Sequence, residues 1–481
     1  MRLLLSLTIV CFFIGCTEGD SPDDSPIPAD VETGKATVWL TMGDQSALLS
    51  QQKPISIRNA KSTSLPVITI DSTNLMQEIE GFGASLTGSS AYLINRKMSA
   101  AQRNALLSDL FEPESGIGIS YLRMSIGASD FSPVAYTYND IPTGETDFDL
   151  DHFSITTDED DVVPVFKEIL EIAPDIKIMG SSWSAPAWMK TNSNLKGGNL
   201  KTETYDVYAR YFVKFMKAYG EHGITIDAVT LQNEPLYKGA PYPCMEMTAA
   251  EQLNFIKDHV GPLFQAEGIE TKIIIYDHNW DNTDYPISIL NDAEARKYIA
   301  GSAFHAYGGD VGAMSIVHHA HPDKGLYFTE IGGGDWSPGF SVDMQWNMNH
   351  IFIGTTKNWS KNALLWNLAL DQNGGPNNSG DEITRGVVKI DNTTGEVVRH
   401  PEYYAIGHMS KFVRPGAFRI ESSASTYISQ LNFVAFMNAD GSKVMVLANS
   451  ATEAKAVTIK QGENQFDYSI PADAVVTVVW N

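Results

Sequence analysis

The sequence is poor in cysteine, in positive charge and in long apolar runs. Only three of its 481 residues are cysteines: Cys11 and Cys16 fall within the first 16 residues, and Cys244 stands alone. This excludes a disulfide framework and a cysteine metal site, so a large apolar core must stabilise the fold. There are 34 Lys and Arg against 58 Asp and Glu, a formal net charge of −24. Such a surface is unsuited to phosphate backbones and argues against nucleic acid as a partner.

The N-terminus carries a short apolar run, residues 3–14, after Arg2. At about a dozen residues it is too short to span a bilayer. The end of this run and the two residues after it, FIGC at 13–16, resemble a bacterial lipoprotein box, in which Cys16 is lipidated after cleavage. The alternative is an ordinary signal peptide cleaved nearby. We expect residues 1–16 to be a lipoprotein signal peptide and 17–35 a disordered acidic tether. The protein is then exported and lipid-anchored to the outer membrane, at the surface of a Gram-negative cell.

Both ends of the remaining chain alternate in the β manner. Near the N-terminus, residues 36–41 and 67–70 read as strands with no amphipathic helix after them. From residue 419 onward the chain reads as short strands separated by turns, and the predicted strands are 426–429, 433–438, 444–449, 456–459 and 474–480. We therefore expect residues 36–78 and 411–481 to form one all-β sandwich domain.

Between these ends, from 79 to 410, the pattern changes to strand, loop and helix, repeated. The clearest helix is 204–220, where aromatic residues recur at helical spacing. The apolar strand runs end near residues 84, 125, 181, 231, 277, 305, 330 and 366. Eight such units predict an α/β fold, a (β/α)8 TIM barrel.

The segment 227–235, DAVTLQNEP, is the most informative of these runs. It begins as a buried strand and stops at an Asn-Glu-Pro sequence that no core strand would carry. Because Pro235 restricts the residue before it, we expect Glu234 to be extended and to project from the strand's carboxyl end. Catalytic groups of such barrels lie there. The competing interpretation is a Glu in an ordinary turn.

Polar and aromatic residues collect at the other strand ends as well, although the packed layers of a barrel are apolar and need none of them. Two glutamates at one barrel mouth, with tryptophans to stack on sugars and Asp, Asn and His to bind hydroxyls, favour glycoside hydrolysis. The residues at the strand ends are Asp130, Phe131, Trp183, Trp188, Asn233, Glu234, Asp277, His278, His305, Tyr307, Glu330, Trp366 and Asn367.

Six motifs in register resemble glycoside hydrolase family 30, the family of lysosomal glucosylceramidase. They are GFGA at 81–84, ASDF at 128–131 followed by YTY at 136–138, SWSAPAWMKTN at 182–192, LQNEP at 231–235, FTEIGG at 328–333, and WNLAL at 366–370 through GGPN at 374–377. The matches run in order from about residue 79 to 377, and a flanking sandwich agrees with the family's architecture.

This resemblance implies a retaining enzyme with Glu234 as acid/base and Glu330 as nucleophile. A retaining enzyme needs its carboxyls only about 5 Å apart. Like charge at that distance raises one pKa, which we expect to keep the acid protonated near neutral pH. The remaining implied site residues are Asn233 at the sugar 2-hydroxyl, Asp130, Trp183 and Trp366 around the non-reducing sugar, Arg123 beneath the site, and His305 and Tyr307 as further substrate-binding groups.

One departure from the family pattern bears on the substrate. Glucosylceramidases resembling the lysosomal enzyme carry His-Trp-Tyr at the sixth strand, whereas this chain has His305, Ala306 and Tyr307. The lost indole favours the branch that cuts β-1,6-linked glucans over a glucosylceramidase, or over a relative acting on xylan or fucosides. A third hypothesis, an inactive carbohydrate-binding lipoprotein, should have replaced one glutamate, and both are present.

The sequence predicts neither a cofactor nor a metal. No dinucleotide fingerprint or phosphate loop is present. The run HHAH at 318–321 lacks the spacing of a helical ligand pair and has no carboxylate close by, so we expect a solvated loop. Oligomeric state cannot be deduced from these features.

Overall fold

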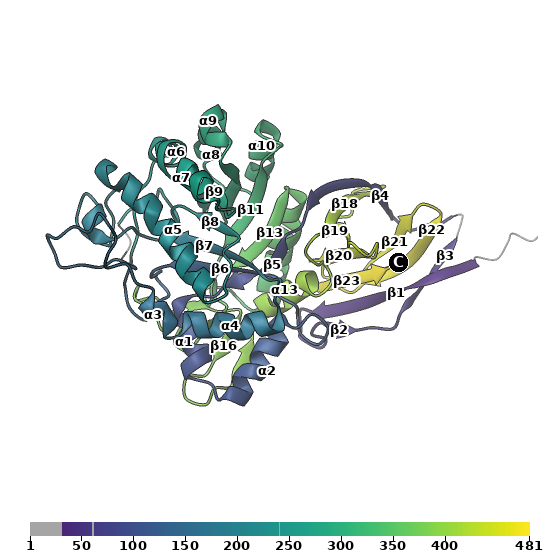
Figure 1. The fold of residues 1–481 in the computed structure, drawn as a ribbon. Coiled ribbons are helices and arrows are strands. Elements are labelled where there is room, and N and C mark those ends of the chain that lie inside the picture. The colour runs from purple at the N-terminus through teal and green to yellow at the C-terminus, as the bar shows by residue number, and fades with distance from the viewer. Residues whose placement is uncertain (1–30, 60–61, 240) are drawn as a thin grey trace, which may run out of the picture.

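The computed structural model describes residues 31–59, 62–239 and 241–481. The predicted signal peptide, Cys16 and the greater part of the predicted tether lie outside these ranges. Figure 1 shows two parts, a barrel wrapped by helices and an all-β part in which purple N-terminal strands lie beside yellow C-terminal ones. The chain therefore leaves the β part, builds the barrel, and returns.

Eight parallel strands close the barrel in the order β10-β11-β13-β5-β6-β7-β8-β9, which confirms the predicted (β/α)8 fold. Each predicted strand has a counterpart. The barrel strands are β5 (Gly81–Ser85), β6 (Tyr121–Ile126), β7 (Lys177–Ser182), β8 (Ala228–Thr230), β9 (Lys272–Asn279), β10 (Ile299–His305), β11 (Gly325–Glu330) and β13 (Ser360–Leu365).

Helices cover the outside of the barrel. Helix α5 (Tyr205–Glu221) realises the predicted 204–220 helix, and its aromatic stripe, including Tyr208, Phe212 and Phe215, is buried against the strands. The other helices are α1 (Gly88–Arg96), α2 (Ala100–Phe111), α3 (Thr156–Glu159), α4 (Val162–Ile172), α6 (Ala249–Phe255), α7 (Gly261–Glu267), α8 (Asp284–Asn291), α9 (Ala293–Arg296), α10 (Gly312–Ala320), α11 (Phe340–Trp346), α12 (Ile353–Lys357) and α13 (Pro401–Ser410). The π-helical turns η3 (Ile256–Val260) and η4 (Asn347–Phe352) join α6 to α7 and α11 to α12, and the 3₁₀ turns are η1 (Ala187–Met189) and η2 (Thr202–Thr204).

An apolar layer fills the barrel interior at mid-height. Seven strands contribute one buried side chain each, namely Tyr121, Met179, Ala228, Ile274, Ala303, Tyr327 and Leu364. Because side chains alternate along a strand, the residues two positions further on point inward again, one layer nearer the carboxyl ends. The apolar layer is therefore the floor on which the next layer rests.

The all-β part is a ten-stranded sheet closed by pairing between β1 and β3, and both chain ends supply its strands, as predicted. Its separate core includes Val38, Ile68, Val457 and Val476. In sheet order its strands are β2 (Ser50–Gln51), β1 (Val31–Met42), β23 (Ala474–Trp480), β20 (Lys443–Asn449), β19 (Leu431–Met437), β18 (Phe418–Ala424), β4 (Val67–Glu78), β21 (Lys455–Gln461), β22 (Asn464–Ile470) and β3 (Ile55–Asn59).

Several details of this part differ from the sequence prediction. Strand β1 begins at Val31, so residues 31–35, assigned to the tether, pair with β3 instead of being disordered. The predicted strand 426–429 is a loop, with Tyr427 91% exposed. Strands β2, β3, β18 and β22 were not predicted, although the alternation in β22 is the pattern of a strand that buries one face.

Short strands near the barrel mouth complete the fold: β12 (Gly333–Gly334) pairs with β15 (Thr384–Arg385), and β14 (Ala369–Leu370), β16 (Val388–Ile390) and β17 (Val397–Arg399) form a small sheet. Across the ranges that the structure describes, every helix is too short or too polar to cross a membrane.

Candidate active site

The layer above the apolar floor is polar on five of the seven strands that form the floor. Counting two residues on from the floor gives Arg123, Ser181, Thr230, His305 and Thr329 on β6, β7, β8, β10 and β11, and all five are buried. On β9 the count gives Tyr276, but the register shifts between β9 and β10 at this point and makes Asp277 an extra residue. Tyr276 and Asp277 both have positive φ, 73° and 63°. This bulge turns the carboxylate of Asp277 into the barrel.

Asp277 is the centre of the polar layer, and its carboxylate accepts hydrogen bonds from every one of those five side chains. Oδ2 accepts from Arg123 (2.8 Å), Ser181 (2.8 Å) and Thr230 (2.6 Å), and Oδ1 from His305 (3.1 Å) and Thr329 (2.7 Å). Burial alone would raise its pKa, but the charge of Arg123 and the bond from His305 hold the pKa well below its usual range. Asp277 is therefore a buried anion that organises the layer, whereas the sequence placed it only among the strand-end residues that could bind hydroxyls.

Arg123 links this anion to Glu330 at the end of β11. Its guanidinium donates to Glu330, to Asp277 and, at 2.7 Å, to the side-chain oxygen of Asn233. Glu330 also accepts a 3.0 Å hydrogen bond from the hydroxyl of Tyr307. Burial and the charge of Glu234 raise the pKa of Glu330, while His305 and Arg123 oppose them, and the net direction is upward. Both donors stabilise the ionised form of Glu330.

Glu234, beyond the end of β8, is not extended as predicted, because its φ is +43°, in the left-handed region. Backbone hydrogen bonds explain the difference: Glu234 N–H donates to the Asp277 carbonyl (3.0 Å), and its own carbonyl accepts from Tyr237 (2.8 Å). These bonds to the neighbouring strand end override the local preference before Pro235. The side chain nevertheless lies at the carboxyl end of the barrel, as expected.

His305 lies between the carboxylates. Nε2 faces Asp277 and Nδ1 faces Glu234, each at 3.1 Å, while Glu330 is 3.9 Å from Nδ1. Burial alone would lower the pKa of His305, but the charge of Glu330 and the bonds to Asp277 and Glu234 raise it to about 9. Since Asp277 stays ionised, Nε2 keeps its proton, and the variable proton lies between Nδ1 and Glu234.

This placement corrects the expected origin of the acid's proton. Like charge from Glu330 was predicted to raise the pKa of Glu234. Burial does raise it, but the hydrogen bond and charge of His305 outweigh burial, and the pKa of Glu234 lies below its ordinary value in the free protein. The proton is therefore stored on the His305–Glu234 pair rather than on Glu234 alone.

A cavity of about 550 Å³ opens over the two glutamates. Of the predicted site residues, Asp130, Glu234, Tyr307, Glu330 and Trp366 line it. Phe131 and His278, which the sequence also placed at the strand ends, line it as well. Sequence reasoning missed its other walls, whose only signal was aromatic residues in loops after β8 and β11: these are Tyr237, Pro241, Tyr242, Asn279, Gly332, Trp336, Ser379, Gly380, Asp381 and Thr384.

Four predicted substrate-binding residues do not line this cavity. Arg123 and His305 are fully buried in the polar layer, and Asn233 is 6% exposed. Trp183 lies behind Trp366, stacked on it at 5.2 Å between ring centroids, and the Arg123 guanidinium lies 4.9 Å from the Trp183 ring. In the free protein these four residues support the site from below.

Asp130 is the one predicted sugar-binding acid that faces the cavity. Within the described residues its Oδ1 is buried without a hydrogen-bond partner. Burial, together with the charges of Glu330 and Glu234, raises its pKa well above the ordinary range. An unpaired buried oxygen is costly, so a hydroxyl-bearing ligand would relieve it.

Glu234, His305 and Glu330 place possible metal-ligand atoms within 4.8 Å of one another. A histidine ligand must be deprotonated, whereas His305 has a pKa of about 9, and Arg123 already neutralises Glu330. The group is better suited to holding a proton than a cation.

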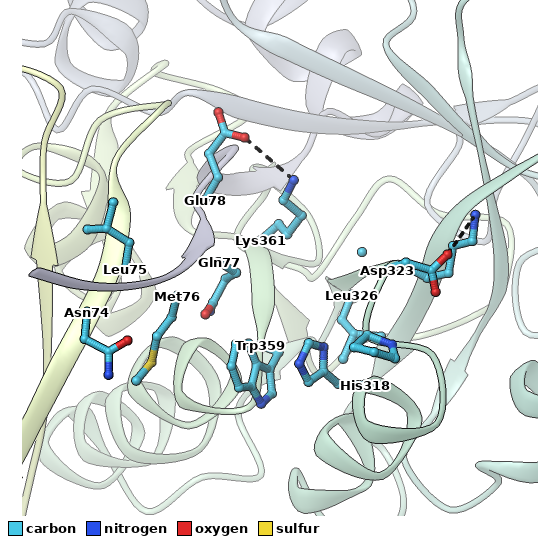
Figure 2. Close-up of a pocket in the computed structure, with 13 residues that line it drawn as sticks. Asn74, Leu75, Met76, Gln77, Glu78, His318, Asp323, Leu326, Trp359 and Lys361 are labelled. Carbon is cyan, nitrogen blue, oxygen red and sulfur yellow. Dashed lines mark ion pairs between the residues drawn. The ribbon is translucent and has the colours of Figure 1, made fainter.

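A second cavity, of about 570 Å³, lies at the opposite end of the barrel strands, and neither Glu234 nor Glu330 lines it. Figure 2 shows Trp359 beside His318, with Leu326 and Lys361 from the starts of β11 and β13. The rings of His318 and Trp359 stack at 3.9 Å. His318 belongs to the last turn of α10, so the expected solvated loop at 318–321 is wrong for its first three residues.

Paired carboxylates at the mouth of a closed (β/α)8 barrel, above a polar layer that supplies each with a cation, define a glycoside hydrolase. More particularly, the chain belongs to glycosyl hydrolase family 30, which confirms the resemblance seen in the motifs. Residues 79–413 match the family's TIM-barrel domain and residues 416–478 its β-sandwich domain.

Its relatives include enzymes with different substrates. The chain is 35% identical over 421 residues to an endo-1,6-β-D-glucanase of Neurospora crassa, covering 84% of this chain and 86% of the relative. It is 29% identical over 448 residues to the lysosomal acid glucosylceramidase of Mus musculus, covering 88% and 84%. A solved endo-β1,6-glucanase matches with a TM-score of 0.86 and 35% identity over 93% of this chain and 99% of that chain.

Replacing His305 with Gln should move the alkaline limit of activity toward neutral pH. With a pKa of about 9, His305 keeps a proton beside Glu234 up to that pH, and the proton that a leaving group needs is lost as pH rises through it. Without the imidazole, the carboxylates alone must hold this proton, and they release it at lower pH. We expect the alkaline limb of the kcat/KM profile, on a glycoside whose leaving group needs protonation, to fall by at least about one pH unit.

The matched control is His318→Gln. The His318 ring stacks on Trp359 and lines the cavity at the opposite end of the barrel strands, away from both glutamates. The alkaline limb of the kcat/KM profile of this variant should stay within a few tenths of a pH unit of the wild-type position. An unmoved limb in His305→Gln, or equal shifts in both variants, would contradict the storage of the proton on the pair.

Proposed function

We propose that the protein is a retaining β-glucanase whose principal substrate is β-1,6-linked glucan. The observation that carries the proposal is the separation of Glu234 and Glu330, which have carboxylate oxygens within 4.8 Å of each other. That spacing suits double displacement, whereas inverting enzymes hold their carboxyls roughly 6.5–9.5 Å apart to admit a water. The similarity to endo-1,6-β-glucanases supports the linkage.

Glu330 is the proposed nucleophile, because Arg123 and Tyr307 both donate to it and stabilise its negative charge. Its carboxylate bonds to the anomeric carbon as the bond to the leaving oxygen breaks, and Glu234 gives that oxygen the proton stored with His305. In the second step Glu234 takes a proton from water, the water oxygen attacks the anomeric carbon, and Glu330 is released. Asp130 and Trp366 would hold the sugar in the cavity.

The mouth of the site supports a polysaccharide over a glycolipid. Ala306, between His305 and Tyr307, is half-buried and packs against the barrel core, so it offers only a methyl group where glucosylceramidases of the lysosomal type carry an indole. The loss removes apolar area that could hold a sphingosine chain. A net charge of −24 does not repel neutral glucan but disfavours acidic glycans.

The two glutamates should separate kinetically. Glu330→Ala should abolish turnover of every substrate, because no covalent intermediate can form. Glu234→Ala should still form the glycosyl-enzyme from dinitrophenyl β-glucoside, because the leaving group of this substrate departs without protonation. Azide should rescue Glu234→Ala with a β-glycosyl azide as product, and Glu330→Ala, if at all, with the α-anomer. The opposite anomers, read by NMR, would reverse the two roles, and inverted product from the wild type would remove the mechanism.

Substrate preference provides the direct test of the proposed linkage. We expect kcat/KM on β-1,6-gluco-oligosaccharides to exceed that on glucosylceramide, xylan or β-1,4-glucan by at least roughly tenfold, about 1.4 kcal/mol of transition-state preference. Product analysis across this panel measures it. Equal or better turnover of glucosylceramide in detergent would return the protein to the glucosylceramidase branch of the family.

We also propose that the protein is held at the outer membrane by lipid on Cys16, which lies outside the described residues. Supporting features are the apolar run 3–14 and its FIGC ending. Cys16→Ala should release the protein from the membrane fraction or leave it unprocessed, whereas Cys11→Ala, a matched change inside the apolar run, should not. A mature-sized Cys16→Ala band that stays with the membrane would defeat the anchor. One acyl chain binds only marginally, so several chains on the cysteine are implied.

A further inference from the structure

Trp336 is an exposed aromatic residue at the mouth of the catalytic cavity. It is 57% exposed, whereas Trp366 at the inner wall of the same cavity is 4% exposed. It stands six positions after Glu330, in the loop that leaves β11. A large apolar side chain exposed beside a catalytic site is a candidate ligand contact.

The loop holds Trp336 in place. Gly333 and Gly334, as β12, pair with β15, and the Asp335 N–H donates to the Ile383 carbonyl at 2.8 Å. Closer to Glu330, the Gly332 N–H donates to the Tyr307 hydroxyl at 3.1 Å. Both ends of the short segment before Trp336 are therefore fixed relative to the nucleophile.

The indole of Trp336 packs directly on the backbone of Gly334. A Cβ at Gly334 would lie 1.9 Å from Cζ3 of Trp336 and 2.3 Å from Cε3 and Cη2. The six-membered ring therefore lies directly against this backbone, with no room for any side chain beneath it. The glycine is needed here for space, because its φ is not positive. With one face seated on backbone, the rest of the ring is free to meet a ligand.

The surroundings favour a sugar over an aliphatic chain. Ser379, Asp381 and Asp130 line the same cavity, and a lipid tail would have to desolvate these polar groups. A β-glucopyranose unit carries equatorial hydroxyls that such groups can bind, and its axial C–H bonds give it an apolar face that fits an indole.

We propose that Trp336, seated on Gly334, is the stacking platform of an additional subsite that binds a glucose unit next to the one being cleaved. The inference rests on the proposed glucanase function and adds that the enzyme grips more than one sugar of the chain. Trp336 binds ground state and transition state alike, so it acts on KM rather than on the chemical step.

The experiment compares Trp336→Ala, Trp336→Phe and Gly334→Ala with wild type on substrates of increasing length. The series runs from β-glucosyl fluoride, which fills only the cleaved subsite and carries no ring in its leaving group, through the matching disaccharide fluoride to gluco-oligosaccharides of the linkage that wild type cleaves fastest. Trp346→Ala is the matched control, because that indole is 37% exposed and stacks on His350 along α11 and η4, outside the cavity.

We expect Trp336→Ala to lose roughly tenfold in kcat/KM on the oligosaccharides, mostly through KM, and to stay within about twofold on the glucosyl fluoride. Trp336→Phe should recover part of the loss. Gly334→Ala should reproduce it, because the new methyl displaces the ring without changing it. A loss already present on the disaccharide fluoride places the subsite on the non-reducing side, and a loss confined to the oligosaccharides places it on the leaving-group side.

Two results would overturn the platform. Equal losses on the glucosyl fluoride and the oligosaccharides would mean that Trp336 acts through the loop on Glu330. An unchanged length dependence in Trp336→Ala, or one that Trp346→Ala shares, would mean that no sugar stacks there. A wrong linkage assignment would be seen separately, in the substrate panel measured on the wild type. The test of Trp336 does not depend on it, because the variant and the wild type are compared on whichever glucan the wild type cleaves fastest.

Discussion

The buried carboxylate of Asp277 is the interaction on which the site depends. It is charged and inaccessible to water, a state that is tolerated because five side chains donate to it, of which Arg123 is a permanent cation and His305, with its pKa of about 9, is a cation at neutral pH. Its donors come from five strands around the barrel. Removing one partner of such a buried pair typically costs about 3–5 kcal/mol, because the other charge is left uncompensated. The same contacts that close the barrel's upper layer therefore also fix its catalytic groups.

Asp277 also gives the two glutamates different environments. Through its contacts with Arg123 and His305 it orients one permanent cation toward Glu330 and one titrating group toward Glu234. Like carboxylates so close together cannot both be freely ionised, and their partners decide which of them holds the proton. Arg123 cannot give up a proton, whereas His305 can. The side of Glu330 is thus suited to attack and the side of Glu234 to proton transfer.

The sequence allows much of this to be predicted, for a physical reason. Parallel strands end together, so polar residues that terminate apolar runs gather at one mouth, and Glu234 and Glu330 were placed there correctly. Alternation along strands could further have placed Ser181 and Thr230 in the polar layer. The inward turn of Asp277 could not be predicted, since it depends on a bulge and two left-handed residues that no local signal marks. Burial of His305 likewise follows from its partners rather than from its sequence neighbours.

Left-handed backbone occurs at the barrel mouth as well as at several positions elsewhere. Glu234, Asp277 and Asn367 all have positive φ, although none is glycine, and each stands near the carboxyl end of a barrel strand. Such residues persist only where surrounding contacts determine them. The polar layer supplies those contacts. The apolar floor beneath it, which includes Tyr121 and Leu364, supplies the packing that keeps the strands in register. The mouth can therefore hold charged and strained groups in fixed positions, which is what a nucleophile and an acid a few ångströms apart require.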